Sequence, residues 1–257
     1  MTNLFDTLTR LSGLAEGMLW PAFLVFLRVG GAMAFIPAFG EQSVPPRVRL
    51  VLALAFSAIV FPAVSSGISQ SGTVTPVFIE LAAGLMLGIG LRLFIVALQI
   101  AGSIIAQSTS LSQLFGGAGP EPQPAMTNLL VIAGLALSVT AGLHIRIAEA
   151  LILSYKVVPA GRLPDSVDFA TWGLSQVGHA FSLGFSLAAP FTIAALLYNS
   201  AMGVINRAMP TLMVSFIGAP ALTGGGLLLL ALLTPVLLTV WQDSFLAFLA
   251  KPFSVAP

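Results

Sequence analysis

The sequence predicts an all-α, polytopic membrane-type protein, and three observations lead to this fold class. Hydrophobic residues make up 57% of the 257 residues, and the mean hydropathy is +1.02. Only 10 residues are lysine or arginine and 9 are aspartate or glutamate, whereas a soluble chain of this length carries about 64 charged residues. The apolar residues are gathered into blocks near the length of about 20 residues that a membrane-spanning helix needs. We therefore expect the surface to face lipid or other protein.

Six apolar blocks are the predicted helices, and no internal repeat is visible among them. A single domain that covers residues 1–257 is predicted. The blocks are residues 19–38, 50–65, 77–106, 127–153, 172–205 and 211–242. Local sequence signals support the predicted N-terminal ends of two of these helices. Thr75-Pro76 before the third block supplies an N-cap residue and a proline suited to the first helical position. A polar turn at residues 164–168 precedes the fifth block.

Proline and glycine interrupt the last two blocks. Pro190 lies in the middle of the fifth, and the sixth contains Gly218-Ala219-Pro220 followed by Gly224-Gly225-Gly226. Because proline removes a helical hydrogen bond, the sixth block is predicted as a short helix, a break, and a helix from about Leu227 to Trp241. Broken helices in hydrocarbon need neighbouring protein or a wet cavity. The breaks therefore indicate either packing into a larger assembly or ordinary proline kinks in a self-contained bundle.

The charges do not define an orientation across the membrane. With alternate crossings, one side holds Arg10, Lys156, Arg162 and Lys251, and the other holds Arg47, Arg49 and Arg207. Simple polytopic proteins usually carry a clearer excess of basic residues on one side. The even distribution indicates either that the six-span arrangement is wrong or that the chain is not laid out as ordinary spans.

Several charged residues lie inside the apolar blocks, where each costs about 2.5–3.5 kcal/mol if it is left unpaired in lipid. Arg146 and Glu149 are three residues apart and can pair on one helix; with His144 they form either a structural pair near a helix end or a proton relay. Glu80 lies in the first turns of its helix, where a carboxylate suits the helix dipole. Arg28 has no acidic neighbour in sequence, so we expect it to face a partner or a wet interior.

A glycine-rich segment at residues 107–120 separates the third and fourth blocks, and no charged residue occurs from Leu93 to Pro120. A solvated loop of this length usually carries some charge. The apolar pair Leu114-Phe115 favours burial in a protein-lined space, and a plain flexible loop is the alternative. The segment has no lysine, so it is not a phosphate-binding loop.

Composition and motifs argue against catalysis and against nucleic-acid binding. The chain has no cysteine, two histidines and a net charge of +1, and it contains no nucleophile-elbow or paired-carboxylate motif. No metal site and no cofactor are predicted. A small-solute secondary transporter is the alternative function, but such proteins usually contain an internal repeat. A structural membrane scaffold is a third possibility.

Four stretches, taken together, resemble the FliR family of flagellar type III protein export gate subunits, which is related to the virulence-type SctT proteins. The resemblance extends over about residues 20–240. The stretches that carry it are Leu27-Arg28-Val29-Gly30-Gly31 with Pro37-Ala38-Phe39-Gly40 and Val44-Pro45-Pro46-Arg47; Glu80 through Gly84, Gly88 and Gly102; Gly142-Leu143-His144 with Ser154-Tyr155-Lys156; and Asn206-Arg207-Ala208-Met209-Pro210 with Phe216-Ile217-Gly218-Ala219-Pro220.

The resemblance implies a specific assembly. Such proteins form bent helical hairpins that pack laterally with FliP-type and FliQ-type subunits into a multi-subunit helical pore. The implied place is the bacterial inner membrane at the flagellar basal body. An FlhB-type export switch protein, membrane lipid and unfolded flagellar substrate proteins are the other implied partners.

The resemblance also implies which residues serve the pore. The plug loop would consist of Ser110, Leu111, Ser112, Gln113, Leu114, Phe115, Gly116, Gly117, Ala118 and Gly119. The residues expected in subunit packing or as buried charges are Arg28, Glu80, Gly84, Gly88, Arg92, Arg146, Glu149 and Arg207. Small residues four apart, as at Gly84 and Gly88, allow helices to approach closely.

Overall fold

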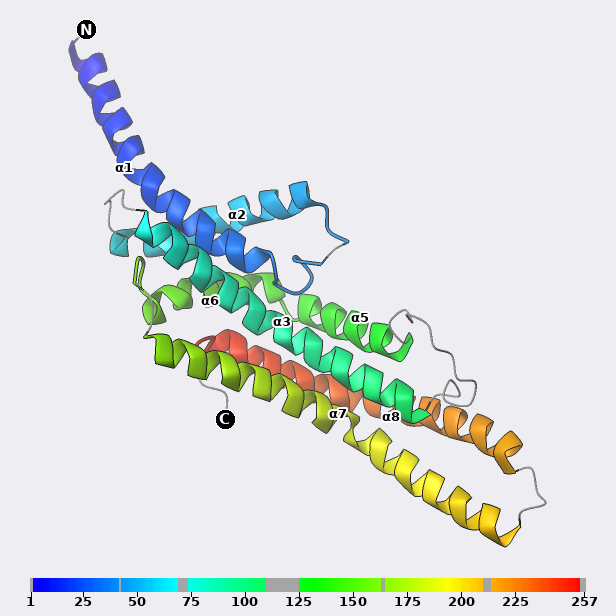
Figure 1. Ribbon diagram of the computed structural model, residues 1–257. Coiled ribbons are helices and arrows are strands. Elements are labelled where there is room, and N and C mark those ends of the chain that lie inside the picture. Colours follow the sequence, from blue (N-terminus) through cyan, green and yellow to red (C-terminus); the bar gives the residue numbers. More distant parts are fainter. Residues whose placement is uncertain are drawn as a thin grey trace. The chain divides into compact units, whose positions relative to one another are not determined.

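A computed structural model describes residues 2–41, 43–68, 74–109, 125–162, 165–209 and 214–254, and within these ranges the regular structure is helical (Figure 1). The elements are α1 (Thr2–Met33), α2 (Pro46–Val64), a short 3₁₀ turn η1 (Ser65–Gly67), α3 (Thr75–Thr109), α5 (Ala125–Thr140), α6 (Leu143–Val157), α7 (Ser166–Ala208) and α8 (Val214–Ala250). The predicted all-α class is confirmed, and each predicted block overlaps a helix.

Among the described residues, four helical segments are long and apolar enough to cross a membrane: Pro46–Gly67, Thr75–Thr109, Val167–Ala208 and Pro220–Ala250. The pair α5 and α6 gives a fifth if it counts as one bent span. The chain is thus a polytopic membrane-type protein, as its composition predicts.

The predicted break in the sixth block is wrong. Helix α8 runs without interruption from Val214 to Ala250 and carries Pro220 and Pro235 inside it. Helix α7 likewise continues through Pro190. In apolar surroundings, an open backbone leaves several polar groups unsatisfied, which costs more than one missing proline hydrogen bond or the weak helix propensity of glycine, about 1 kcal/mol per residue.

The actual break lies in the fourth block, which the sequence pattern indicated as one helix. Helices α5 and α6 are bent by 77° where they meet. Gly142 stands at the joint with φ +79°, a left-handed conformation that only glycine adopts without strain. A glycine of this kind ends the first helix and allows the chain to start the second in a new direction.

The chain forms two compact units, and the first comprises Met1–Arg92, Val139–Gln176 and Leu246–Pro257. It contains α1, α2, α6 and the first half of α3. Its core is formed by fully buried aliphatic side chains, among them Val25 and Val29 of α1 and Ile147 and Leu151 of α6. Helix α1 packs against α2, which in turn packs against α6.

The second unit comprises Leu93–Ser138 and Val177–Phe245. Trp241 of α8 is fully buried at its centre. The indole Nε1–H of Trp241 donates a hydrogen bond to the Phe94 carbonyl oxygen at 2.8 Å. Phe245, one turn further along α8, stacks on the Trp241 ring with 5.1 Å between the centroids. Aromatic packing therefore joins α8 to the second half of α3.

Candidate functional site

A buried ion pair lies at the centre of the first unit. Arg28 of α1 and Glu80 of α3 are both 0% exposed. Arg28 Nε donates to Glu80 Oε2 at 2.7 Å, and Arg28 Nη2 donates to Glu80 Oε1 at 3.1 Å. This two-point geometry matches the planar guanidinium to the carboxylate and is the strongest form of the pair. Arg28 therefore faces an acid of its own chain, not the partner or the wet interior that the sequence led us to expect.

Further hydrogen bonds satisfy the remaining donors of Arg28 and acceptors of Glu80. Arg28 Nη1 donates to Ser154 Oγ at 3.1 Å and to the Val158 carbonyl oxygen at 3.0 Å. Glu80 accepts from the Tyr155 hydroxyl and from the Gly161 backbone N–H, both at 3.1 Å. We call Arg28, Glu80, Ser154 and Tyr155 the charge node. Since buried charges are tolerated when paired and hydrogen-bonded, the node ties α1, α3 and α6 together.

The Tyr155 ring also covers the guanidinium, with Arg28 Cζ 3.7 Å from the ring centroid. A cation over an aromatic face is attracted by the ring's negative charge density, and the attraction is larger where water is excluded. Tyr155 thus contacts both members of the ion pair, which the sequence gave no means to foresee.

Close approach of α1 and α3 makes the node possible. A Cβ atom added to Gly84 would lie 2.0 Å from the Arg28 carbonyl oxygen, and one on Gly88 would lie 2.6 Å from the Ala32 carbonyl oxygen. Any larger residue would push the two backbones apart. Both glycines therefore pack within the chain, and Gly84 lies one turn after Glu80, where the approach brings the carboxylate to Arg28.

A second, more exposed ion pair joins Arg92 of α3 to Glu41, which follows α1. Arg49 of α2 donates from Nη2 to the carbonyl oxygens of Glu41 and Val44, at 3.0 and 3.2 Å. The side chains of Arg92 and Glu41 are 31% and 24% exposed. These contacts hold the connection between α1 and α2 against α3.

The structure does not bring together the other predicted charges. Arg146 and Glu149 are both exposed on α6, and within the described residues no ion pair joins them. The pair that the sequence allowed is therefore not formed in the described residues, and both side chains are left exposed on the helix surface. His144 is exposed on the same helix, and Arg207 is exposed in the last turn of α7, where a basic residue suits the helix dipole.

The predicted plug loop, Ser110–Gly119, lies outside the described residues, but the helices on both sides of it are described. Thr109 ends α3 and is 3% exposed. The Thr223 hydroxyl of α8 donates to the Thr109 carbonyl oxygen at 3.1 Å. A Cβ on Gly226, one turn further along α8, would lie 2.2 Å from Thr109 Cγ2. The end of α3 is thus held against α8.

The segment after the loop is held at the same place. Thr109 Oγ1 lies 3.5 Å from the sulfur of Met126, in the first turn of α5. A Cβ on Gly102 of α3 would lie 2.5 Å from Thr127 Cα. We call Gly102, Thr109, Thr127, Thr223 and Gly226 the loop stem. It fixes the residues on both sides of 110–124 to one point of the second unit.

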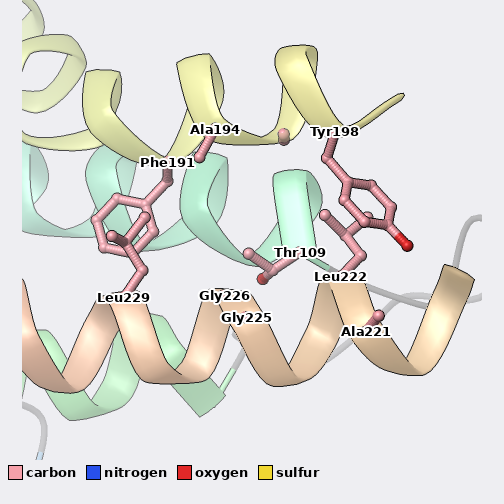
Figure 2. Close-up of a pocket in the computed structure, with 10 residues that line it drawn as sticks. Thr109, Phe191, Ala194, Tyr198, Ala221, Leu222, Gly225, Gly226 and Leu229 are labelled. Atoms are coloured by element: carbon pink, nitrogen blue, oxygen red, sulfur yellow. The ribbon is translucent and has the colours of Figure 1, made fainter. Parts of the chain in front are cut away.

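An open apolar cavity of about 120 Å³ lies beside the stem between α7 and α8 (Figure 2). Thr109 of α3 and Gly225 and Gly226 of α8 are among the residues that line it. The other lining residues are Phe191, Ala194, Ala195, Tyr198, Ala221, Leu222 and Leu229. The Tyr198 hydroxyl donates to the Gly218 carbonyl oxygen at 2.6 Å, which ties α7 to α8. Sequence reasoning interpreted the glycines of α8 as a break and missed their packing role.

Comparisons with known proteins place the chain in a family. The family model for bacterial export proteins, family 1, matches residues 19–248. The chain is 35% identical to the flagellar biosynthetic protein FliR of Caulobacter vibrioides over 231 residues, which are 87% of this chain and 92% of that protein. It is 28% identical to FliR of Aquifex aeolicus, with 91% and 93% covered, and 27% identical to FliR of Escherichia coli, with 88% and 87% covered.

These matches span both compact units, so they include the charge node and the loop stem alike. The chain therefore belongs to the FliR family, the membrane components of the flagellar type III export apparatus.

Proposed function

We propose that this chain forms part of the protein-conducting pore of the flagellar export gate and keeps it closed until export. In this proposal the chain acts as one domain in the bacterial inner membrane, at the flagellar basal body. Its partners are FliP-type and FliQ-type subunits and an FlhB-type switch protein. Unfolded flagellar proteins pass through the pore as substrates.

The observation that carries the proposal is a set of apolar helix faces that the chain does not cover itself. In the most apolar part of α8 only 22% of residues are buried, against 61% in α3. Leu228, Leu232, Val236 and Val240 are exposed on α8 at a four-residue spacing. Such a spacing places them on one side of the helix. A long apolar face of this kind needs lipid or neighbouring subunits to cover it.

Exposed apolar residues also line α7, of which Leu174, Phe181, Phe185, Leu196 and Leu197 are examples. Helices α7 and α8 are joined through Tyr198 and Gly218. A hairpin with apolar residues on its outer sides suits lateral packing against hairpins of similar shape. This supports assembly into a multi-subunit pore.

The proposed mechanism of closure is steric. Residues 110–119 act as the plug, with Leu114 and Phe115 as the occluding side chains, and the loop stem supports the plug from one side. FliR-family export gate proteins are non-enzymatic, so other components supply the energy for opening.

The partners are tested by co-purification. A tagged chain, expressed with FliP-type and FliQ-type subunits from the same organism, should elute with both as one complex in mild detergent. A chain that elutes alone when both subunits are present in the membrane contradicts the proposed assembly.

The plug is tested by deleting residues 110–119 in the assembled complex. With the occluding residues gone, the gate should leak small ions, measured as conductance in a planar bilayer or as dissipation of an ion gradient in vesicles. Co-purification of the deleted chain with its partners is the control for assembly. Unchanged permeability in a fully assembled complex contradicts the plug.

A further inference from the structure

We propose that a cavity of about 400 Å³ in the first unit binds a substituted ammonium group. Small-molecule sites have volumes of about 300–1,000 Å³. This cavity falls within that range, whereas the cavity of about 120 Å³ beside the loop stem does not. The proposal is independent of the pore, so either can fail without the other.

The cavity lies where two helices end and a third begins. Val157 and Val158 line it at the end of α6, Asp168 and Trp172 in the first turns of α7, and Phe253 just after α8. All of them belong to the first unit. The ends of apolar helices are the level at which lipid headgroups and water-soluble molecules reach a membrane protein.

Two aromatic residues that line the cavity are held in place by hydrogen bonds. Trp172 Nε1 donates to the Pro252 carbonyl oxygen, and Gln176 Nε2 donates to the Ser254 carbonyl oxygen, both at 3.2 Å. These bonds hold the chain on both sides of Phe253, whose ring centroid lies 5.6 Å from that of Trp172. The aromatic part of the lining is therefore formed before a ligand arrives, as is usual in binding sites.

The chemistry of the lining favours an organic cation. Of the residues that line the cavity, Asp168 alone is ionisable, and it forms no ion pair within the described residues. Phe169 adds a third aromatic side chain, and Met86 adds apolar surface. Aromatic faces attract ammonium groups, and quaternary ammonium ligands are recognised in this way. One carboxylate beside aromatic rings thus matches a positive charge that carries carbon substituents.

A metal ion fits this lining less well. Calcium and magnesium need several oxygen ligands. Among the described residues, no group of three or more histidine, cysteine or acidic side chains lies close enough to hold a metal ion. An anion is disfavoured because the one charge that faces it would be negative.

An exposed apolar strip on α7 borders the cavity. Thr171, which lines the cavity, lies one turn after Val167 and one turn before Leu174. Residues at this spacing share one side of a helix. Val167 and Leu174 are 66% and 76% exposed. The acyl chains of a lipid would cover this strip while its ammonium headgroup enters the cavity, whereas a free amine needs no such surface.

The first experiment tests whether the cavity recognises charge. The full chain is kept in maltoside micelles, whose headgroups carry no ammonium, and choline binding is measured by saturation transfer to the choline methyl protons in NMR. Tetramethylammonium should displace choline, and the uncharged carbon analogue of choline should do so far less. Equal displacement by both would overturn the proposal, because the site would then recognise only shape.

Matched variants locate the binding. Asp168→Asn should weaken choline binding about tenfold, which corresponds to about 1.4 kcal/mol. Asp243→Asn, at an exposed acid of α8 in the second unit, should leave it unchanged. Equal affinities of the two variants contradict the assignment to this cavity.

A second pair of variants keeps the carboxylate. The first turn of α7 also gains stability from Asp168 through the helix dipole, so loss of Asp168 alone is not sufficient evidence. Phe253→Leu removes one ring and should weaken choline binding about threefold. Phe181→Leu, at an exposed phenylalanine of α7 in the second unit, is the control. No difference between these two variants shows that the rings do not take part and overturns the aromatic site.

The source of the ammonium group is tested in vesicles. Two sets hold the chain with the same share of phosphatidylglycerol, and the remaining lipid is phosphatidylethanolamine in one and an uncharged galactolipid in the other. If a lipid headgroup fills the cavity, choline should bind more weakly in the first set, and Asp168→Asn should remove the difference. Equal choline affinity in both sets identifies a free amine as the ligand. Absence of choline binding in the micelles and in the galactolipid vesicles overturns the proposal.

Discussion

The charge node and the loop stem solve the same problem, the joining of long apolar helices, by different physical means. In the node, α1, α3 and α6 are joined by a buried ion pair with hydrogen bonds to Ser154, Tyr155 and two backbone groups. In the stem, α3, α5 and α8 are joined through glycines against threonines, and no charged side chain takes part.

The difference bears on what each region can tolerate. A buried ion pair is strongly directional, and removal of one member leaves the other charge uncompensated. A glycine contact depends only on shape and can shift without leaving a buried charge. A change in the node therefore carries an electrostatic cost, whereas a change in the stem acts mainly through shape.

The largest expected effect comes from breaking the node. Arg28→Ala leaves Glu80 buried without its cation, which costs about 3–5 kcal/mol. We expect the variant to accumulate poorly in membranes and to fail to co-purify with partner subunits. Arg47→Ala, which removes an exposed arginine of α2, is the control and should behave like the wild type.

The double variant Arg28→Ala/Glu80→Ala sharpens this test. Since both charges are gone, it should recover part of the loss, as expected for a coupled pair. A double variant as defective as Arg28→Ala alone would mean that Arg28 acts through something other than Glu80. Normal assembly of the single variant Arg28→Ala would show that the charge node is not needed for folding or assembly.

An intermediate effect is expected where the node itself depends on a glycine. Gly84→Ala would place a Cβ 2.0 Å from the Arg28 carbonyl oxygen, and overpacking of this kind costs about 1–3 kcal/mol. The melting temperature of the purified chain in detergent should fall. Gly30→Ala on α1, where an added Cβ meets nothing within 4 Å, is the matched control and should not lower it.

The smallest effect is expected at the partly exposed ion pair. Arg92→Ala removes its contact with Glu41, and pairs that water still reaches contribute about 1 kcal/mol or less. The melting temperature should change little, and the small difference should shrink at high salt because ions screen the pair. A loss as large as that of Arg28→Ala would show that burial does not set the strength of these pairs.

The sequence predicted the helices well and their breaks poorly. Length and hydropathy located six apolar blocks, each of which overlaps a helix. The breaks were misplaced because a proline or glycine signals only a weaker helix, and whether the helix continues depends on what surrounds it. All three consecutive glycines of α8 stay helical, although only Gly226 packs closely on a neighbour, whereas Gly142 takes a left-handed conformation that ends α5.

The sequence likewise identified some of the site residues and missed others. The resemblance to the FliR family, carried by the order of four short stretches, is confirmed by the family match over residues 19–248. Arg28 and Glu80 were identified as charges in apolar blocks, but their pairing was missed because 52 residues separate them. Thr109, Thr223 and Gly226 were missed because threonine and glycine in an apolar helix carry no chemical signal until a neighbour is known.

By itself, the sequence determined that most of the surface must face lipid or other protein, and it located the apolar blocks that form the helices, since the transfer of apolar residues from water depends on composition and spacing. It also determined the family. Only the tertiary structure decided which charges are neutralised within the chain and which glycines lie at contacts. Those properties depend on distances between residues remote in sequence, and such distances are set by how the helices pack.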